Sequence, residues 1–331
     1  MEYKFRFSEK QRKKMTKVLL IIFLSQMSFS QVTSNNHFVG NDKTSKNLLK
    51  KISNNTSKFD IYILWGYNRS FHAPSTTQIE TKNGTIQIVD AKAYDRPTEL
   101  GLNYINPTKF TTPQYNFKIG FSKQTKSGER GVELGIDHMK WVFDEKRAYD
   151  INGDYREDLH AITENGYEQL SFQELIEAEN ATPFQFEYSD GHNYVYVSQF
   201  FLFDILQLLQ EKIKFSIGVE GGAGLYIPKP HLKKLLKTEN SFDYEGKNGH
   251  FQLSGHGFHA GLKTKIMFFN RLFIESSMRG ININNHSNIT SPEEITINQK
   301  SMKSVEFYTG IGLILKRKKT KQEPQKGPLS Y

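Results

Sequence analysis

The residues with the clearest capacity for metal chemistry are four oxygen donors at close spacing. They are Asp150, Asn152, Asp154 and Asp158. Their spacing resembles a calcium-binding loop, but the glycine falls at Gly153 rather than at the sixth position and no bidentate glutamate closes the loop. The surrounding stretch, 143–192, holds thirteen acidic and three basic residues. We interpret the four residues as candidate ligands for divalent cations in a mainly solvated acidic loop, and we predict no cofactor.

A hydrolytic enzyme would need a nucleophile, a base and an orienting group. His138 and Ser276 are candidates by type, but they lie far apart in the chain and no Ser-x-x-x-His or nucleophile-elbow pattern connects them. The chain has no cysteine, which excludes a cysteine nucleophile, disulfides and thiolate metal clusters. We therefore predict no catalytic residue.

The sequence contains eight segments in which apolar residues alternate with small or polar ones. Any functional site must be positioned by these segments. Alternation is the period of a β-strand, and each segment is about as long as a tilted strand that crosses a bilayer. The clearest one places Phe215, Ile217 and Val219 on the same face. The pattern predicts an all-β protein, a transmembrane antiparallel up-and-down β-barrel of about eight strands. The segments are 59–68, 115–123, 130–142, 193–205, 215–227, 254–268, 272–282 and 305–315.

The other face of these segments carries charges of both signs. By strand phase it holds four cationic side chains, Lys265 among them, and five acidic ones. A barrel in lipid turns its apolar face outward and its polar face into the lumen, whereas a soluble sandwich would have to bury the apolar face. We predict a closed polar lumen in which these groups pair instead of lining a water-filled pore. The predicted lumen network comprises Lys118, Glu133, Asp137, Glu220, His259, Lys263, Glu275, Arg279 and Glu306.

The connections between the segments alternate between long and short. Gaps of about 46, 50, 26 and 22 residues follow the odd-numbered segments, and gaps of about 6, 9 and 3 follow the even-numbered ones. Transmembrane barrels have long extracellular loops and short periplasmic turns. Ser171 and Glu174 form a capping box that predicts a short surface helix within the second long gap. We predict a barrel over 59–316 with extracellular loops at 71–113, 143–192, 228–252 and 284–303.

The stretch 59–316 resembles a known class through several short phrases. These are Trp65-Gly-Tyr-Asn-Arg69, Asp95-Arg-Pro97, Tyr104-Ile-Asn-Pro107, Pro113-Gln-Tyr-Asn116, Asp137-His-Met-Lys140 and Asp190-Gly-His-Asn193. They are similar to phrases of an uncharacterised group among the small eight-stranded outer-membrane β-barrels of Gram-negative bacteria, of the OmpA-membrane-domain or OmpX kind. The resemblance implies the architecture and no catalytic residue. The chain departs from that class because its last strand ends at Leu315 and not on an aromatic residue.

The formal net charge of +9 belongs to the two ends of the chain. Residues 1–30 and 316–331 each carry a surplus of five positive charges, so the part between them is nearly neutral and we exclude nucleic acid as a partner. A basic stretch, the apolar run 18–24 and Ser28-Phe-Ser30 form a cleavable signal peptide over 1–30. Residues 31–58 then form a flexible periplasmic segment, and 317–331 a basic periplasmic tail. The mean hydropathy of -0.58 excludes a polytopic helical membrane protein.

These expectations imply secretion through the inner membrane and a place in the outer membrane, with the barrel assembly machinery, membrane lipid and lipopolysaccharide as partners. Residues 231–237 read as a basic amphipathic turn at the barrel mouth, with an ordinary solvated helix face as the alternative. Candidate lipopolysaccharide contacts are Lys233, Lys234, Lys237, His138 and Lys140. The function predicted is structural or surface-interacting. The alternatives are a lipid A or lipopolysaccharide-modifying enzyme and a narrow channel for small solutes; a general pore is disfavoured because eight strands leave room only for side chains.

Overall fold

The computed structural model describes the barrel and most of its connections. The described residues are 59–99, 101, 113–144, 149–163, 166–177, 184–209, 212–237, 242–289 and 294–316. The predicted signal peptide, the segment 31–58 and the tail 317–331 lie outside them. Across these ranges, no helix has both the length and the apolar character needed to cross a membrane.

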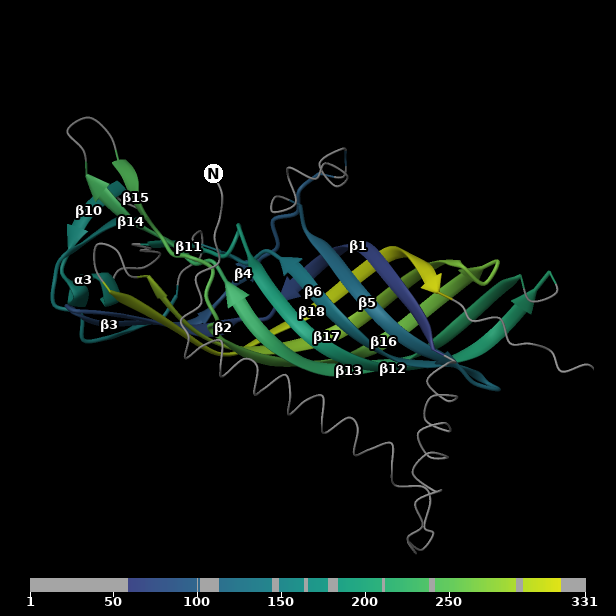
Figure 1. The fold of residues 1–331 in the computed structure, drawn as a ribbon. Coiled ribbons are helices and arrows are strands. Elements are labelled where there is room, and N and C mark those ends of the chain that lie inside the picture. The colour runs from purple at the N-terminus through teal and green to yellow at the C-terminus, as the bar shows by residue number, and fades with distance from the viewer. Residues whose placement is uncertain are drawn as a thin grey trace, which may run out of the picture.

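Eight antiparallel strands close into a ring, because the first strand pairs with both the second and the last (Figure 1). The eight predicted segments fall in these strands in the same order, which confirms the predicted barrel. The ring consists of β1 (Asp60–His72), β5 (Tyr115–Gln124), β6 (Gly128–Met139), β12 (His192–Leu208), β13 (Ile213–Pro228), β16 (Gly255–Phe268), β17 (Leu272–Ile289) and β18 (Ile295–Lys316).

The ring strands are staggered. A path from Asp60 through successive register partners returns to β1 at Ser70, ten residues farther along. Such a stagger accompanies a steep strand tilt, and eight strands then enclose an interior that side chains can fill. We call the end of the ring at Asp60 and Lys316 the terminal end.

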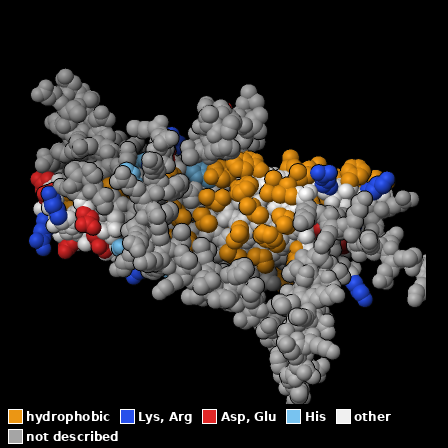
Figure 2. Space-filling model, viewed as in Figure 1, with side chains coloured by type: hydrophobic (Ala, Val, Ile, Leu, Met, Phe, Trp, Pro, Cys, Tyr) orange, Lys and Arg blue, Asp and Glu red, His pale blue; other side chains and the backbone are white. Residues whose placement is uncertain are grey.

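The outer wall of the ring carries an apolar belt. On β13, Ile217 and Val219 are exposed while Gly218 and Glu220 are buried, because successive side chains of a strand point to opposite faces. Figure 2 shows the hydrophobic side chains gathered over the middle of the barrel, with Lys and Arg at its ends. The belt has the position and chemistry of a surface that faces lipid.

The hairpin of β12 and β13 reaches farther at the terminal end than its neighbour. Pairing of β12 with β6 ends at Gly128↔Phe203, whereas pairing with β13 continues to Leu208↔Ile213 (Figure 1). A bulge after Asp204 keeps the following apolar residues exposed. The exposed apolar residues of this projecting hairpin are Ile205, Leu206, Leu208 and Leu209.

At the opposite end the ring continues into a second β-structure, which we call the extension (Figure 1). One part continues the barrel sheet beyond β18 with β2 (Ser75–Thr81), β3 (Gly84–Ala91) and β8 (Ile151–Gly153). A separate sheet has the order β15 (Phe242–Asn248), β14 (His231–Lys237), β11 (Phe184–Glu187), β7 (Val142–Phe143) and β4 (Ala93–Tyr94). A hairpin of β9 (Leu159–Thr163) and β10 (Gly166–Leu170) and the helix α3 (Phe172–Glu177) complete it.

The extension has a hydrophobic core of its own. Trp141 lies 1% exposed within it, and Tyr194 and Tyr226 from the ring strands join the same cluster. This core therefore runs without a break into the upper lumen. Other members include Ile79, Ile86, Ile88, Phe143, Phe186, Tyr188, Leu232, Ile283, Ile289 and Ile297.

Two predicted loop features differ in the structure. Most of 284–303 is paired strand, because the ladder between β17 and β18 continues through Asn285↔Gln299 to Ile289↔Ile295. Residues 231–237 are strand β14 and not a helical turn, because backbone pairing with β11 on one side and β15 on the other outweighs the local amphipathic pattern.

The capping box predicts a helix that the structure confirms. Helix α3 begins at Phe172, directly after Ser171. The Ser171 backbone N–H donates to Glu174 Oε2 at 2.7 Å, and the Glu174 N–H donates to Ser171 Oγ at 3.3 Å. These hydrogen bonds hold the pKa of the Glu174 carboxyl below its usual value.

Candidate functional site

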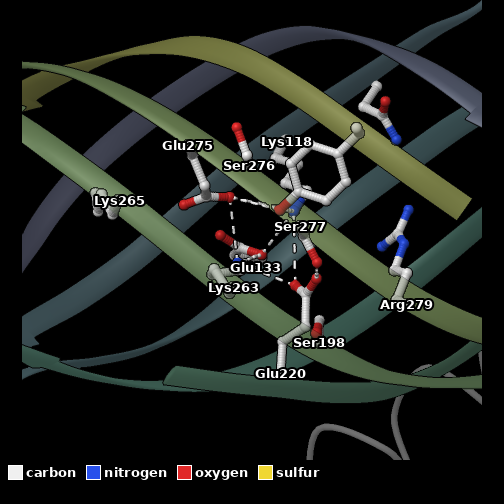
Figure 3. Close-up of polar contacts among 12 residues, drawn as sticks. Lys118, Glu133, Ser198, Glu220, Lys263, Lys265, Glu275, Ser276, Ser277 and Arg279 are labelled. Carbon is white, nitrogen blue, oxygen red and sulfur yellow. Dashed lines mark hydrogen bonds and ion pairs between the residues drawn. The ribbon is translucent and has the colours of Figure 1, made fainter. Parts of the chain in front are cut away.

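The middle of the lumen is filled by a central cluster of two lysines and three glutamates. Lys118 on β5 and Lys263 on β16 point into the lumen from opposite walls, and the glutamates surround them (Figure 3). Lys263 Nζ lies 2.7 Å from Glu133 Oε2, 3.0 Å from Glu220 Oε2 and 3.2 Å from Glu275 Oε1. Lys118 Nζ lies 3.2, 3.7 and 3.3 Å from the same three carboxylates. Every side chain of the cluster is 0% exposed.

An upper cluster forms around Arg279, one step closer to the extension. Its Nε lies 2.5 Å from Glu306 Oε2, and its Nη2 contacts Asp137. Asn116 Nδ2 bridges the two acids by donating to Asp137 Oδ1 and Glu306 Oε1. The guanidinium carbon also lies 4.7 Å from the ring centre of Tyr196. The cluster joins walls that lie far apart in the sequence, although Arg279 Nη1 and Asn116 Oδ1 have no hydrogen-bond partner among the described residues.

A lower ion pair joins Lys265 and Glu129, with Nζ 3.0 Å from both carboxylate oxygens. Glu129 was missed by the sequence analysis because the predicted strand began one residue later. It shares the inward phase of Glu133, so a strand boundary one residue earlier would have found it. Aromatic rings cover this pair, and Lys265 Nζ lies 4.2 Å from the ring centre of Phe273 and 4.7 Å from that of Tyr62.

Apolar side chains close the lumen below the central cluster. This lower core is made of Tyr62, Leu64, Phe200, Leu202, Met267, Phe273 and Ile314. Two of its aromatic rings lie over glycines of the neighbouring strand: Tyr62 over Gly120, and Phe273 over Gly312. A side chain at either glycine would collide with the ring. The lumen is closed and contains the charged groups, as predicted, and apolar side chains pack on either side of the central cluster.

His259 lies in the lumen but does not join the carboxylates. Its Nε2 is 3.0 Å from Ser198 Oγ and its Nδ1 is 3.1 Å from Tyr194 OH. His259 makes no described contact with Glu275, because the ladder pairs His259 with Ile281, six residues farther along β17. The Ser198 and His259 pair resembles a hydrolase dyad in type only: Ser198 is 0% and His259 5% exposed, and no carboxylate orients the imidazole.

The candidate lipopolysaccharide contacts on β6 and just after it are covered. His138 is 2% exposed; its Nδ1 lies 2.7 Å from Asn193 Oδ1, and its ring stacks on Tyr115. Lys140 is 9% exposed and donates from Nζ to Thr98 Oγ1 at 3.2 Å, and burial lowers the pKa of its ammonium. Both side chains are buried, so neither presents an exposed cation. The remaining three, Lys233, Lys234 and Lys237, lie on β14 within the extension.

His138 and Ser276, the two candidates by residue type, are not brought together. Ser276 lies on the outer face of β17, where its Oγ is 2.6 Å from Thr309 Oγ1, whereas His138 lies on β6 across the ring. These two residues therefore do not form a nucleophile–base pair.

The candidate metal ligands are not brought together either. Asp154 Oδ1 accepts a hydrogen bond from the Thr85 backbone N–H at 2.7 Å, which uses this carboxylate to join β3 to the segment after β8. Asn152 lies on β8 with its backbone paired to Gln87. Within the described ranges, no group of three or more His, Cys, Asp or Glu residues is placed to hold a metal ion.

Two carboxylates hold the extension to the ring. Asp95 accepts hydrogen bonds from Arg69 Nε at 2.8 Å, from the Ser70 backbone N–H at 3.2 Å and from Gln114 Nε2 at 2.6 Å. Asp190 Oδ2 lies 3.2 Å from His231 Nε2 and 2.7 Å from Lys229 Nζ. The hydrogen bonds from His231 and Lys229 hold the pKa of the Asp190 carboxyl well below its usual value. These contacts fix the turns that lead into and out of the extension.

No protein-family model matches the chain. Among solved structures, it is similar to the outer membrane protein AlkL in lipid bilayers, with 10% identity, 88% of this chain and 99% of that chain covered, and a TM-score of 0.33. The outer membrane protease OmpT from Escherichia coli aligns at 9% identity, over 78% and 96% of the two chains, with a TM-score of 0.35. The attachment invasion locus protein Ail of Yersinia pestis aligns at 10% identity, over 77% and 97%, with a TM-score of 0.24.

The chain has the architecture of a small outer-membrane β-barrel. This statement rests on the closed eight-strand ring, its apolar outer belt and its charged interior. The resemblance expected for 59–316 is confirmed at the level of architecture. What AlkL, OmpT and Ail do is a property of those proteins and is not transferred to this one.

Proposed function

We propose that this protein is a sealed outer-membrane barrel that holds a folded β-domain, the extension, at the cell surface, in a structural or surface-interacting role. One observation carries the proposal. The lumen is filled along its length by the lower core, three sets of ion pairs and the core of the extension, so the barrel serves as a rigid support and not as a conduit.

The strand count and the lengths of the turns indicate how the barrel is oriented in the membrane. Eight strands return the chain to the end of the ring where it entered, and the turns at that terminal end are short. In transmembrane barrels the short turns are periplasmic and the long connections extracellular. We therefore infer that the extension lies outside the cell, which is also what the predicted signal peptide supports.

Cysteine accessibility tests the orientation, because the chain has no native cysteine. Asn83→Cys lies in the turn between β2 and β3, at the tip of a hairpin of the extension, and Lys126→Cys lies in the turn between β5 and β6 at the terminal end. On intact cells a membrane-impermeant maleimide is expected to label N83C and not K126C, and to label both after lysis. Labelling of K126C alone on intact cells would mean that the terminal end, and not the extension, lies outside the cell.

Planar-bilayer recording tests the seal. Purified barrel, refolded in detergent and checked by its faster migration on gels when unboiled, is expected to give no conductance steps. Stepwise conductance from the folded protein would support the channel alternative and reject the sealed barrel.

A further inference from the structure

Basic side chains surround the barrel at its terminal end, directly below the apolar belt. They come from the hairpin of β5 and β6, from the turn between β12 and β13, and from the turn between β16 and β17, so each of the three turns at this end contributes. We call this set the basic rim. It comprises Lys123, Lys126, Arg130, Lys212 and Arg271. Four of the five are exposed, and Lys123 is half-buried.

The described acidic residues of the same region form no ion pair with the rim. Asp60 is 7% and Glu129 5% exposed, and Glu129 is paired with Lys265 inside the lumen. Asp204 is half-buried and accepts hydrogen bonds from Ser216 Oγ at 2.7 Å and from Gln207 Nε2 at 3.3 Å. Within the part of the chain that the structure describes, the positive charge of the rim is therefore not compensated by an ion pair.

The rim lies where a lipid headgroup layer would lie. Exposed apolar residues of the belt lie close to its cations in sequence: Phe121 is two residues before Lys123, and Leu272 directly follows Arg271. Lys and Arg side chains lie with their apolar stems along such a surface and their charges at the headgroup level. In Figure 2, Lys and Arg side chains stand at the terminal edge of the hydrophobic belt.

We propose that the basic rim binds the phosphate groups of anionic glycerophospholipids in the leaflet at the terminal end. A ring of cations at the border of an apolar belt suits many headgroups at once, whereas a peptide or nucleic-acid partner would favour charges collected on one face. The choice of glycerophospholipid over lipopolysaccharide rests on the proposed orientation, which puts this end in the periplasmic leaflet. Each rim cation attracts anionic lipid through a short-range, salt-sensitive field.

The lipid preference of the reconstituted barrel tests the basic rim, and this test does not depend on the orientation of the barrel. The barrel is reconstituted in phosphatidylcholine vesicles, and the association of spin-labelled phosphatidylglycerol is compared with that of spin-labelled phosphatidylcholine by electron paramagnetic resonance. We expect phosphatidylglycerol to be preferred about two- to fivefold at low salt, and the preference to fall toward one at 1 M salt, where the screening length is about 3 Å.

A matched pair of variants separates the rim from the net charge. The rim variant carries K126Q, R130Q and R271Q. The control carries K92Q, R156Q and K300Q, which remove three positive charges from the extension and the adjoining end of β18. The rim variant is expected to lose at least half of the preference and the control to keep it, with both folded by gel mobility. Equal loss in both, or no preference in the wild-type protein, would overturn the proposal.

A competition experiment with unlabelled lipids identifies which class of lipid supplies the phosphate groups. Unlabelled cardiolipin is expected to displace spin-labelled phosphatidylglycerol more effectively than lipid A does at equal phosphate. Displacement by lipid A that is equal or stronger, and is lost in the rim variant, would overturn the assignment to glycerophospholipid. The cysteine labelling of N83C and K126C reports the orientation separately, so failure of the rim and failure of the proposed function are distinguished.

Discussion

Arg279 on β17 and Asp137 on β6 stand on opposite walls of the ring, four strands apart in either direction, and their side chains meet across the lumen. Glu306 on the strand next to β17 binds the same guanidinium. The three side chains therefore connect walls that the hydrogen-bond ladder joins only through the strands between them. The lumen charges act as internal cross-links of a small barrel.

Replacing Arg279 with methionine should leave Asp137 and Glu306 buried without their cation. We expect R279M to lose about 3–5 kcal/mol of unfolding free energy, because removal of one partner leaves a buried charge uncompensated. Urea unfolding in detergent, followed by the gel mobility of folded and unfolded forms, measures this loss. Arg130→Met on the exposed outer face is the control and should change little. A stability for R279M close to that of the wild-type protein would contradict the cross-linking role.

Neighbouring residues on β13 should respond oppositely to substitution. Val219 is 49% exposed on the belt, and an arginine there should cost about 2–4 kcal/mol if it faces the bilayer midplane. Glu220 faces the lumen, and E220Q leaves two lysines with two glutamates in the central cluster, so a small effect is expected. Assembly yield in the outer membrane compares the two. Equal tolerance of V219R and E220Q would mean that the assigned facing is wrong.

Substitution of Gly312 by a larger residue should be destabilising, because the Phe273 ring lies over it. A Cβ at Gly312 would collide with the Phe273 ring, so G312A should lose about 1–3 kcal/mol through overpacking. Gly221, on the outer wall, is the matched control, because the nearest atom to its Cβ would be 3.5 Å away. The double variant G312A/F273L should recover part of the loss. A double-mutant cycle on urea unfolding measures the coupling, and a coupling near zero would reject the contact.

The Asp190 contacts should stabilise the extension in a pH-dependent way. The pKa of Asp190 is lowered from its usual 3.8 by hydrogen bonds from His231 and Lys229. A carboxylate with a lowered folded-state pKa stabilises the fold above the unfolded-state pKa and loses that contribution as the pH falls through the folded-state value. D190N should therefore be less stable than the parent at pH 5 to 6, with the difference shrinking below about pH 4.

The fluorescence of Trp141 measures this difference, because Trp141 lies in the core of the extension and the chain has one other tryptophan, Trp65. A Trp65→Phe background isolates the signal. Thermal midpoints of the extension that are the same for D190N and its parent at pH 6 would show that the contacts carry no stability.

The facing of each strand was predictable because a strand allows only two side-chain directions. That constraint was sufficient to place Lys118, Glu133 and Arg279 inside the barrel. Which groups meet depends on the stagger between strands, which no single strand encodes. His259 therefore pairs with Ser198 and Tyr194 instead of Glu275, although all of them lie on the inward phase.

The extension was the part that sequence patterns did not predict. Its strands are short, and β14 has the spacing of an amphipathic helix. Their stability comes from ladders between distant segments, such as Phe184↔Lys234, and from packing around Trp141. Because these terms depend on contacts across the fold, local propensity does not report them.

Because the hairpin of β12 and β13 projects, the apolar outer surface extends farther along the barrel axis on one side of the molecule than on the other. A bilayer of uniform thickness cannot match both sides at once. The barrel axis must lean, or the surrounding leaflet must swell beside Leu206 and Leu208 and thin elsewhere. The protein would then deform the lipid around it unevenly, and a neighbour with the complementary mismatch would be drawn to that side.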